Sequence, residues 1–280
     1  MDTKFWGPSG WRLLHLISFT YDEKNKKAVK EFFELLPFVL PCKFCRASLT
    51  EYMDEDPVDL SSRVALSKWL WRIHNKVNEK LRGQGLLKEK DPSFESVKKM
   101  YEDRISAGIE FFEGWDFLFS IAENHPYSRD AKKSLPMEGC PNKESLLCEK
   151  DKNRWNTMTP DERFNKYTEF WKIVGNVLPF DEWKDAWKGC KINVKTFEER
   201  KTLVKEIWRI RCCIETNLEL VKHEKFQSLC KRLASHRSGC GKKLRARTCR
   251  RSTRSTRSTR TSVAKVPTRR LKRISHRVPK

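Results

Sequence analysis

The sequence predicts an all-α protein, and two observations lead to that prediction. Apolar side chains recur at intervals of three and four residues over most of the first 235 positions, as in Val29, Phe32, Phe33 and Leu36. No run of alternating apolar and polar residues persists long enough to indicate a strand. With 280 residues, of which 11% are aromatic, the chain is long enough for one large or two ordinary domains with buried cores.

Residues 1–105 are expected to form a compact bundle of four helices followed by a short fifth helix. Residues 5–10 indicate a turn, and the helices are predicted at 11–21, 26–39, 41–53, 62–81 and 94–103. Pro41 suits the first position of the third helix, because a backbone N–H is not needed there. Gly83 is expected to end the fourth helix.

The rest of the chain divides into a helical segment and a basic tail. Residues 106–235 are rich in aromatic residues at helical spacing and predict a second helical domain, whose role the sequence does not assign. Residues 236–280 contain an Arg-Ser-Thr repeat, a composition that cannot offset the entropy of ordering, so we expect disorder.

The charge of the chain is concentrated in this tail. The net charge is +22, and residues 241–280 carry 16 Lys and Arg with no Asp or Glu, which leaves about +6 for the other residues. Such a tail is expected to contact nucleic acid or another polyanion without sequence specificity. The alternative is an extension that only keeps the protein soluble.

Neither a secretion signal nor a membrane span is expected. The first residues lack the apolar core of a signal peptide. The most apolar run, residues 32–40, is far shorter than the roughly 20 residues that a bilayer requires. Ten cysteines are many for a cytosolic protein, where structural disulfides are rare. Either most of them are reduced, or the protein belongs to a system that oxidises thiols in that compartment.

Cys42 and Cys45 form a C-x-x-C pair at the start of the third expected helix. Free backbone N–H groups and the helix dipole stabilise a thiolate there, and Lys43 and Arg46 add positive charge. Such a pair exchanges with other thiols through a mixed disulfide. Half of a zinc site is the alternative for the pair alone, but no second motif completes four ligands, so no metal is expected.

Two other expected helices carry polar and aromatic residues on one face, and the fourth helix is expected to converge with the C-x-x-C helix on one ligand. His74, Asn75 and Asn78 share a face of the fourth expected helix, and Trp11 and His15 share a face of the first. Taken one at a time, each of these histidines is more often a satisfied core residue, and Trp11 is more often core as well.

These motifs together resemble the Erv/ALR family of FAD-linked sulfhydryl oxidases. The resemblance rests on Trp11-x-x-x-His15, on L-P-C-x-x-C over 40–45 and on W-L-x-x-x-H-N-x-V-N-x-K-L over 69–81. It covers about residues 1–105 and implies a bundle that holds FAD noncovalently. It implies oxidation of dithiols in protein substrates, with electrons passing through Cys42–Cys45 and FAD to O₂ to give hydrogen peroxide.

The resemblance also implies residue roles. Cys45 would lie next to the flavin, and Cys42 would exchange with substrate. The residues expected to line FAD are Gly7, Pro8, Ser9, Trp11, His15, Trp71, His74, Asn75, Asn78 and Lys80. Cellular members often carry a cysteine where Trp71 stands, bonded to another near position 94, so that structural disulfide is missing here.

The other cysteines carry weaker signals. Family members usually have a second, mobile dithiol, and the candidate shuttle pair is Cys140 and Cys148 in a polar loop. A structural disulfide or two free thiols are the alternatives for that pair. Cys212 and Cys213 are expected to be buried in an apolar helix, and Cys190 carries no signal.

The long extension resembles forms encoded by large cytoplasmic DNA viruses, which implies action in the host cytoplasm or the virion. A homodimer is expected, with thiol-containing proteins as substrates, directly or through a thioredoxin-like relay. Two rival classes stay open. A flavin-free thiol–disulfide oxidoreductase would need a strand before the C-x-x-C pair. A nonenzymatic virion or nucleic-acid-packaging protein would rest on the tail and on residues 106–235.

Overall fold

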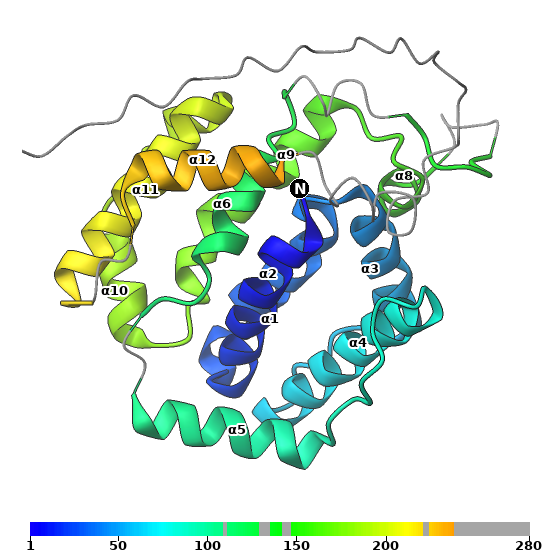
Figure 1. Cartoon of the computed structure of the whole chain (residues 1–280), viewed down its shortest axis with the longest axis horizontal. Helices are drawn as coiled ribbons and strands as arrows, with labels where there is room; N and C mark the ends of the chain where they lie inside the picture. Colours follow the sequence, from blue (N-terminus) through cyan, green and yellow to red (C-terminus); the bar gives the residue numbers. More distant parts are fainter. Residues whose placement is uncertain (109–110, 129–134, 142–146, 221–223, 238–280) are drawn as a thin grey trace, which may run out of the picture. The chain divides into compact units, whose positions relative to one another are not determined.

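The described part of the chain is entirely helical, which confirms the all-α prediction. The computed structural model describes residues 1–108, 111–128, 135–141, 147–220 and 224–237, and every regular element in these ranges is a helix (Figure 1). The expected basic tail lies outside the described residues, apart from its first two positions. No helix within the described ranges is both long and apolar enough to cross a bilayer.

Five helices form the first part of the structure. They are α1 (Thr3–Phe19), α2 (Lys26–Val39), α3 (Lys43–Glu55), α4 (Arg63–Gly83) and α5 (Phe94–Ala107). Three of them begin at side-chain caps of the expected kind, because Asp2, Ser62 and Ser93 each accept a hydrogen bond from a backbone N–H in the first turn. The bounds predicted for the second helix are those observed, and α4 ends at Gly83 as expected.

The predicted turn over residues 5–10 is wrong, because α1 begins at Thr3 and continues through Pro8. A proline inside a helix removes one backbone hydrogen bond and costs about 3 kcal/mol. Contacts with a distant segment favour the helix here. The Ser9 hydroxyl donates to the Glu113 carbonyl at 2.6 Å, and a Cβ on Gly10 would lie only 3.0 Å from the Phe117 ring.

The expected start of the third helix at Pro41 is also wrong by two residues. Helix α3 begins at Lys43, and Cys42 is its N-cap in an extended backbone conformation. The Cys42 sulfur accepts the hydrogen bond that a serine or aspartate would accept at other helix starts. The reactive pair therefore lies at the N-cap and third positions of the helix.

The second part of the structure is helical as predicted. It contains α6 (Trp115–Glu123), α8 (Glu149–Trp155), α9 (Pro160–Ile173), α10 (Asp181–Gly189), α11 (Arg200–Asn217) and α12 (Phe226–His236). Helix α9 begins with a capping box, in which Thr159 and Glu162 each bond the backbone of the other.

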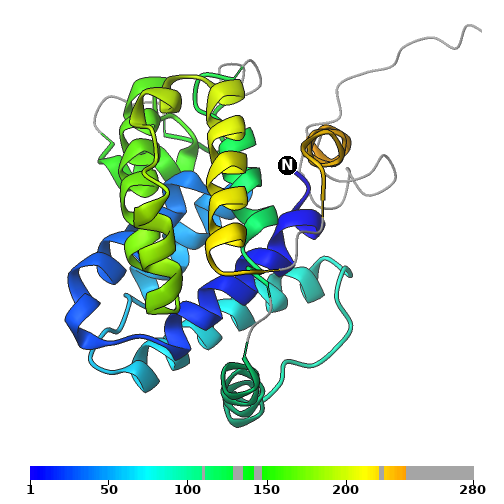
Figure 2. The same cartoon turned by 90° about the vertical axis from the view of Figure 1, so that its left-hand side faces the viewer.

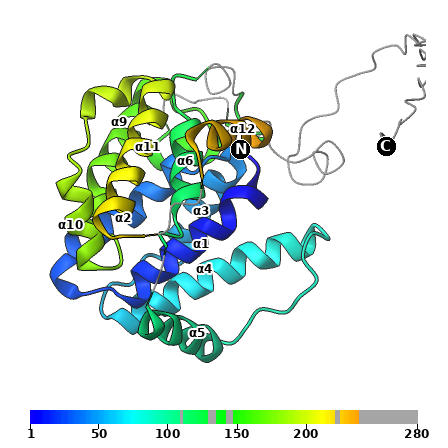
Figure 3. The same cartoon turned by 60° about the vertical axis from the view of Figure 1, so that its left-hand side comes forward.

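One hydrophobic core joins the two parts of the sequence. The described residues up to 237 belong to one compact unit, with α9 packed on α2 and α6 packed on α1 (Figures 2 and 3). The rings of Phe32 and Phe170 stack 5.7 Å apart, and both side chains are fully buried. Packing therefore continues across residue 105, and the domain boundary expected there stays a prediction.

Candidate active site

The two cysteines of the C-x-x-C pair lie together at the start of α3. The backbone N–H of Cys45 donates to the Cys42 sulfur at 3.4 Å, and both cysteines are reduced thiols in this structure. Both side chains are partly buried. The pair therefore has the proximity that a C-x-x-C motif requires, with one sulfur receiving a hydrogen bond from the first turn of the helix.

The environment of the pair lowers the pKa of one thiol and raises the pKa of the other. A hydrogen bond from the Cys45 thiol, helped by the Cys45 N–H and the charge of Arg46, lowers the pKa of Cys42 to about 6, although burial opposes this. The same hydrogen bond, together with burial, raises the pKa of Cys45 well above its usual value. In the reduced pair Cys42 is therefore the thiolate, which suits a cysteine that exchanges with other thiols.

Trp11 and His15 of α1 meet His74 of α4, as the sequence predicts. The Trp11 and His74 rings stack with centroids 3.8 Å apart, and His15 Nε2 lies 3.1 Å from His74 Nδ1. Burial lowers the pKa of His15 to about 3 and that of His74 to about 4. Both imidazoles are therefore neutral near pH 7, and one nitrogen donates to the other.

The residues of this cluster fit the FAD that the sequence leads us to expect. His15 is buried, and its Nδ1 has no hydrogen-bond partner within the described part of the chain. A buried ring nitrogen without a partner costs free energy, so a polar edge of a bound group would stabilise it. The planar Trp11 and His74 rings suit a flat heteroaromatic group.

Other predicted residues of α4 have partners that the sequence did not indicate. Asn78 Nδ2 donates to Asp91 at 2.8 Å, and Arg82 bonds both oxygens of the same carboxylate. Lys80 Nζ donates to Ser48 Oγ on α3 at 2.6 Å, which brings a positive charge toward Cys45. Asp91 lies in the loop between α4 and α5, where no local pattern marks it as a partner.

Two further predicted residues lie apart from this network, and one residue that was not predicted joins the histidine pair. Trp71 is partly exposed and donates to the Pro92 carbonyl at 3.0 Å. Asn75 lies on α4, one residue after His74, and is partly exposed. Tyr101 of α5 stacks on His15 with centroids 5.2 Å apart, and sequence reasoning missed it. Tyr101 lies in the predicted fifth helix, where no motif marks it as a residue of the site.

The predicted residues at the start of α1 do not all point toward the cluster. The hydroxyl of Ser9 is buried and engaged by Glu113 and Phe117 of the second segment. Pro8 is exposed and Gly7 is partly exposed. The structure therefore brings Trp11, but not the Ser9 side chain, to the histidine pair.

The candidate shuttle cysteines lie in a segment that reaches the start of α3. Cys148 is exposed at the N-cap of α8, and its thiol donates to Asp151 at 3.1 Å. The carbonyl of Leu135, five residues before Cys140, accepts hydrogen bonds from Lys43 Nζ at 3.2 Å and from Asn156 Nδ2 at 2.9 Å. Residues 142–146 lie outside the described residues, and the pairing of the two cysteines stays a prediction.

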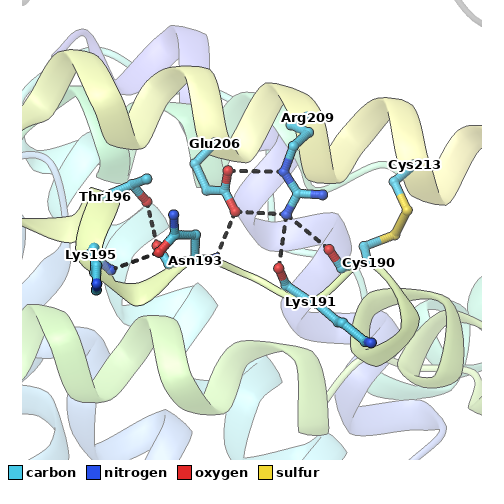
Figure 4. Close-up of polar contacts among 8 residues, drawn as sticks. All are labelled: Cys190, Lys191, Asn193, Lys195, Thr196, Glu206, Arg209 and Cys213. Atoms are coloured by element: carbon cyan, nitrogen blue, oxygen red, sulfur yellow. Dashed lines mark hydrogen bonds and ion pairs between the residues drawn. A yellow bond between two sulfur atoms is a disulfide. The ribbon is translucent and has the colours of Figure 1, made fainter.

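A disulfide joins two cysteines that sequence reasoning did not pair. Cys190, after α10, is bonded to Cys213 on α11, with Cα atoms 5.9 Å apart (Figure 4). Beside the disulfide, Arg209 forms a bidentate pair with Glu206 and also donates to the carbonyls of Cys190 and Lys191. Spacing could not reveal this bond, because the two cysteines lie 23 residues apart and meet only through helix packing.

Comparison with known proteins gives consistent matches in the first part of the chain. Residues 8–101 match the model of the Erv1/Alr family. The chain is 33% identical to a mitochondrial FAD-linked sulfhydryl oxidase of Saccharomyces cerevisiae over 85 residues, 29% of this chain and 45% of that protein. It is 34% identical over 79 residues to an FAD-linked sulfhydryl oxidase of Arabidopsis thaliana, covering 27% of this chain and 41% of that protein.

A viral protein is also similar to the chain. A probable FAD-linked sulfhydryl oxidase of Acanthamoeba polyphaga mimivirus is 35% identical over 85 residues, 28% of this chain and 59% of that protein. The matches thus span about half the length of these relatives. No solved structure is significantly similar to the chain.

Proposed function

We propose that this chain, whose residues 8–101 match the model of the Erv1/Alr family, is a member of that family and an FAD-linked thiol oxidase that forms disulfide bonds in protein substrates. The observation that carries the proposal is the acidic Cys42 thiol beside Cys45, combined with the neutral His15–His74 pair stacked on Trp11. The names of the matched relatives support the same activity and the same cofactor.

The exchange chemistry follows from the two cysteines. A substrate thiolate attacks the Cys42 sulfur of the oxidised pair; the substrate–Cys42 bond forms while the Cys42–Cys45 bond breaks, and Cys45 leaves with the electron pair. The Cys45 thiolate takes up a proton, a second substrate thiol loses one and displaces Cys42, and the products are a substrate disulfide, a Cys42 thiolate and a Cys45 thiol. Cys42 is a good leaving group because the Cys45 thiol and Arg46 stabilise its thiolate.

The cofactor would be held by residues of α1 and α4. Trp11, His15 and His74 would contact its planar rings, and Lys80 would meet a negatively charged part. When bound, FAD supplies the two-electron acceptor that reoxidises the dithiol and the site at which O₂ is reduced to hydrogen peroxide.

Purified protein should be yellow and should show the absorbance of bound flavin at about one equivalent per chain. The flavin should be released by acid, because the family resemblance implies noncovalent binding. A folded, colourless preparation that does not take up added FAD would refute the proposed function. It would favour the flavin-free oxidoreductase, although the helix α2 before Cys42 is not the strand that such an enzyme needs.

Several partners belong to the proposal. Thiol-containing proteins are the proposed substrates, directly or through a thioredoxin-like relay, with Cys140 and Cys148 as the shuttle pair. A homodimer would have to use faces other than those that α1 and α2 present to α6 and α9, because these are already covered. A host cytoplasm or a virion is the proposed place of action.

Removal of residues 241–280 should leave thiol oxidation unchanged and weaken binding to nucleic acid. This segment carries 16 positive charges and lies outside the described residues. Counterion release makes such binding depend steeply on salt, so the full chain should lose affinity for duplex DNA between about 50 and 200 mM salt. Fluorescence anisotropy of labelled DNA measures this at both concentrations. Equal affinities for the full and shortened chains would rule out the tail as the binding segment.

A further inference from the structure

The stretch that leads into Cys42 obtains its hydrogen-bond partners from distant parts of the chain. The carbonyl of Pro37 accepts from Asn153 Nδ2 at 2.9 Å, and that of Phe38 accepts from Arg163 at 3.2 Å. Both carbonyls belong to the last turn of α2, where the carbonyl groups have no backbone N–H partner within the helix. Asn153 and Arg163 lie in α8 and α9, outside the matched residues 8–101. The second segment therefore helps to fix the path of the chain into the reactive pair.

Arg46 is the buried cation behind this stretch. Only 6% of the residue is exposed, and its guanidinium donates to the Leu40 carbonyl at 2.9 Å and to Asn156 Oδ1 at 3.0 Å, while its Nε has no partner within the described ranges. Both partners are neutral. A buried charge is costly unless an opposite charge compensates it. The groups that raise the pKa of Arg46 against the effect of burial are Cys42 and Cys45.

Asn156 is held in one orientation by its own contacts. It ends α8 in the left-handed conformation, with φ 58°, which asparagine tolerates better than most residues. Its Nδ2 donates to the Leu135 carbonyl, so its Oδ1 faces Arg46. The residue is 6% exposed, which leaves little room for the amide to turn.

We propose that Asn156 is a positioning residue that aims the buried guanidinium of Arg46 at the C-x-x-C pair, so that the second segment of this chain sets the reactivity of Cys42. The proposal rests on the proposed function only in taking Cys42 as the thiol that exchanges with substrate. It gives α8, which lies outside the matched residues, a direct effect on the thiol chemistry of α3.

Other charged groups also face the pair or the guanidinium of Arg46. Lys80 of α4 lowers the pKa of Cys45, and the amino group of Met1 donates to the Pro41 carbonyl at 3.2 Å and favours the Cys42 thiolate. Lys43 is held by the Leu135 carbonyl. Arg163 repels Arg46 from α9. None of these side chains is replaced in the test below, and only Lys43 shares a partner with Asn156, the Leu135 carbonyl.

Two substitutions at position 156 separate charge from structure. Asn156→Asp keeps the shape of the side chain and tolerates the left-handed backbone, but it places a carboxylate on Arg46 that competes with the Cys42 thiolate. Asn156→Gly keeps the left-handed backbone and removes the amide. Glu219→Gly is the matched control, because Glu219 is an exposed residue with φ 53° after α11.

The readout is the rate at which iodoacetamide alkylates Cys42 in the reduced, full-length protein under nitrogen, followed from pH 4 to 10. Trypsin cleaves after Lys43 and after Arg46, so Cys42 and Cys45 are measured on different peptides. We expect the Asn156→Asp profile to shift to higher pH, with alkylation of Cys42 about tenfold slower at pH 5, which corresponds to a rise of about one pKa unit. Asn156→Gly should shift in the same direction by less, and Glu219→Gly should match the unmodified protein.

A purely structural role for Asn156 would lower the melting temperature and leave the Cys42 profile unchanged. A folded Asn156→Asp protein with the unmodified profile would therefore overturn the proposal. If that variant does not fold, an Asn156→Gly profile equal to that of Glu219→Gly would overturn it instead. The alkylation does not require oxidase turnover, so failure here is distinguishable from the absence of flavin, which would refute the proposed function.

Discussion

Replacing Cys45 by serine should abolish oxygen consumption with dithiothreitol while bound FAD is retained. A serine at this position cannot form the disulfide that receives electrons from substrate, so the loss should be on the order of a thousandfold or more. The local fold should survive, because the backbone N–H of residue 45 can still donate to the Cys42 sulfur at the start of α3. An oxygen electrode measures turnover, and the flavin spectrum measures cofactor content.

The control for this substitution is Cys230→Ser, at an exposed position on α12. Its turnover should equal that of the unmodified protein. Unchanged turnover in Cys45→Ser would contradict the proposed role of the pair. Loss of flavin together with activity would show that Cys45 also supports the cofactor site, and Cys42→Ser would then test the exchange step separately.

Removal of the Cys190–Cys213 disulfide should have the largest effect on stability. The bond restricts a loop of 23 residues, so its loss through Cys190→Ala combined with Cys213→Ala should lower the free energy of unfolding by about 3 kcal/mol. For a unit of this size the melting temperature should fall by roughly 6 to 12 °C. Cys190 is 3% exposed, so part of the effect comes from lost packing in the core.

Thermal unfolding without reductant, followed by circular dichroism, provides the measurement. Cys230→Ala serves as the control and should melt like the unmodified protein, because its side chain is exposed. With reductant present, the unmodified protein should approach the double variant. Equal melting temperatures for the unmodified protein and the double variant without reductant would contradict a stabilising role.

Local patterns predicted most helices but failed where distant contacts outweighed them. The bounds of α2 were predicted correctly, because its apolar residues repeat at regular helical spacing. The start of α1 was predicted wrongly. Gly7 and Pro8 locally favour a turn, but Ser9 and Gly10 pack against the second segment, and this packing favours the helix. Such packing depends on residues about a hundred positions away, so a pattern read over ten neighbouring residues cannot predict it.

Some contacts of the candidate site could be predicted from local patterns, and others depend on distant parts of the chain. The meeting of Trp11 and His15 with His74 could be predicted, because each element presents its residues at helical spacing and the family resemblance indicates that these faces converge. The partner of Asn78, which is Asp91, and the partner of Ser9, which is Glu113, could not be predicted. Both partners lie in irregular segments whose course depends on the whole fold.

The sequence by itself determined the helical class, the C-x-x-C pair at a helix start and the residues on the faces of α1 and α4, because periodicity and capping act over a few neighbouring residues. Only the tertiary structure decided which residues surround the pair. Arg46 and Asn156 are 110 positions apart, and Cys190 meets Cys213 only where α10 and α11 pack. These contacts result from burial of a shared apolar core, which brings distant segments together without any local signal.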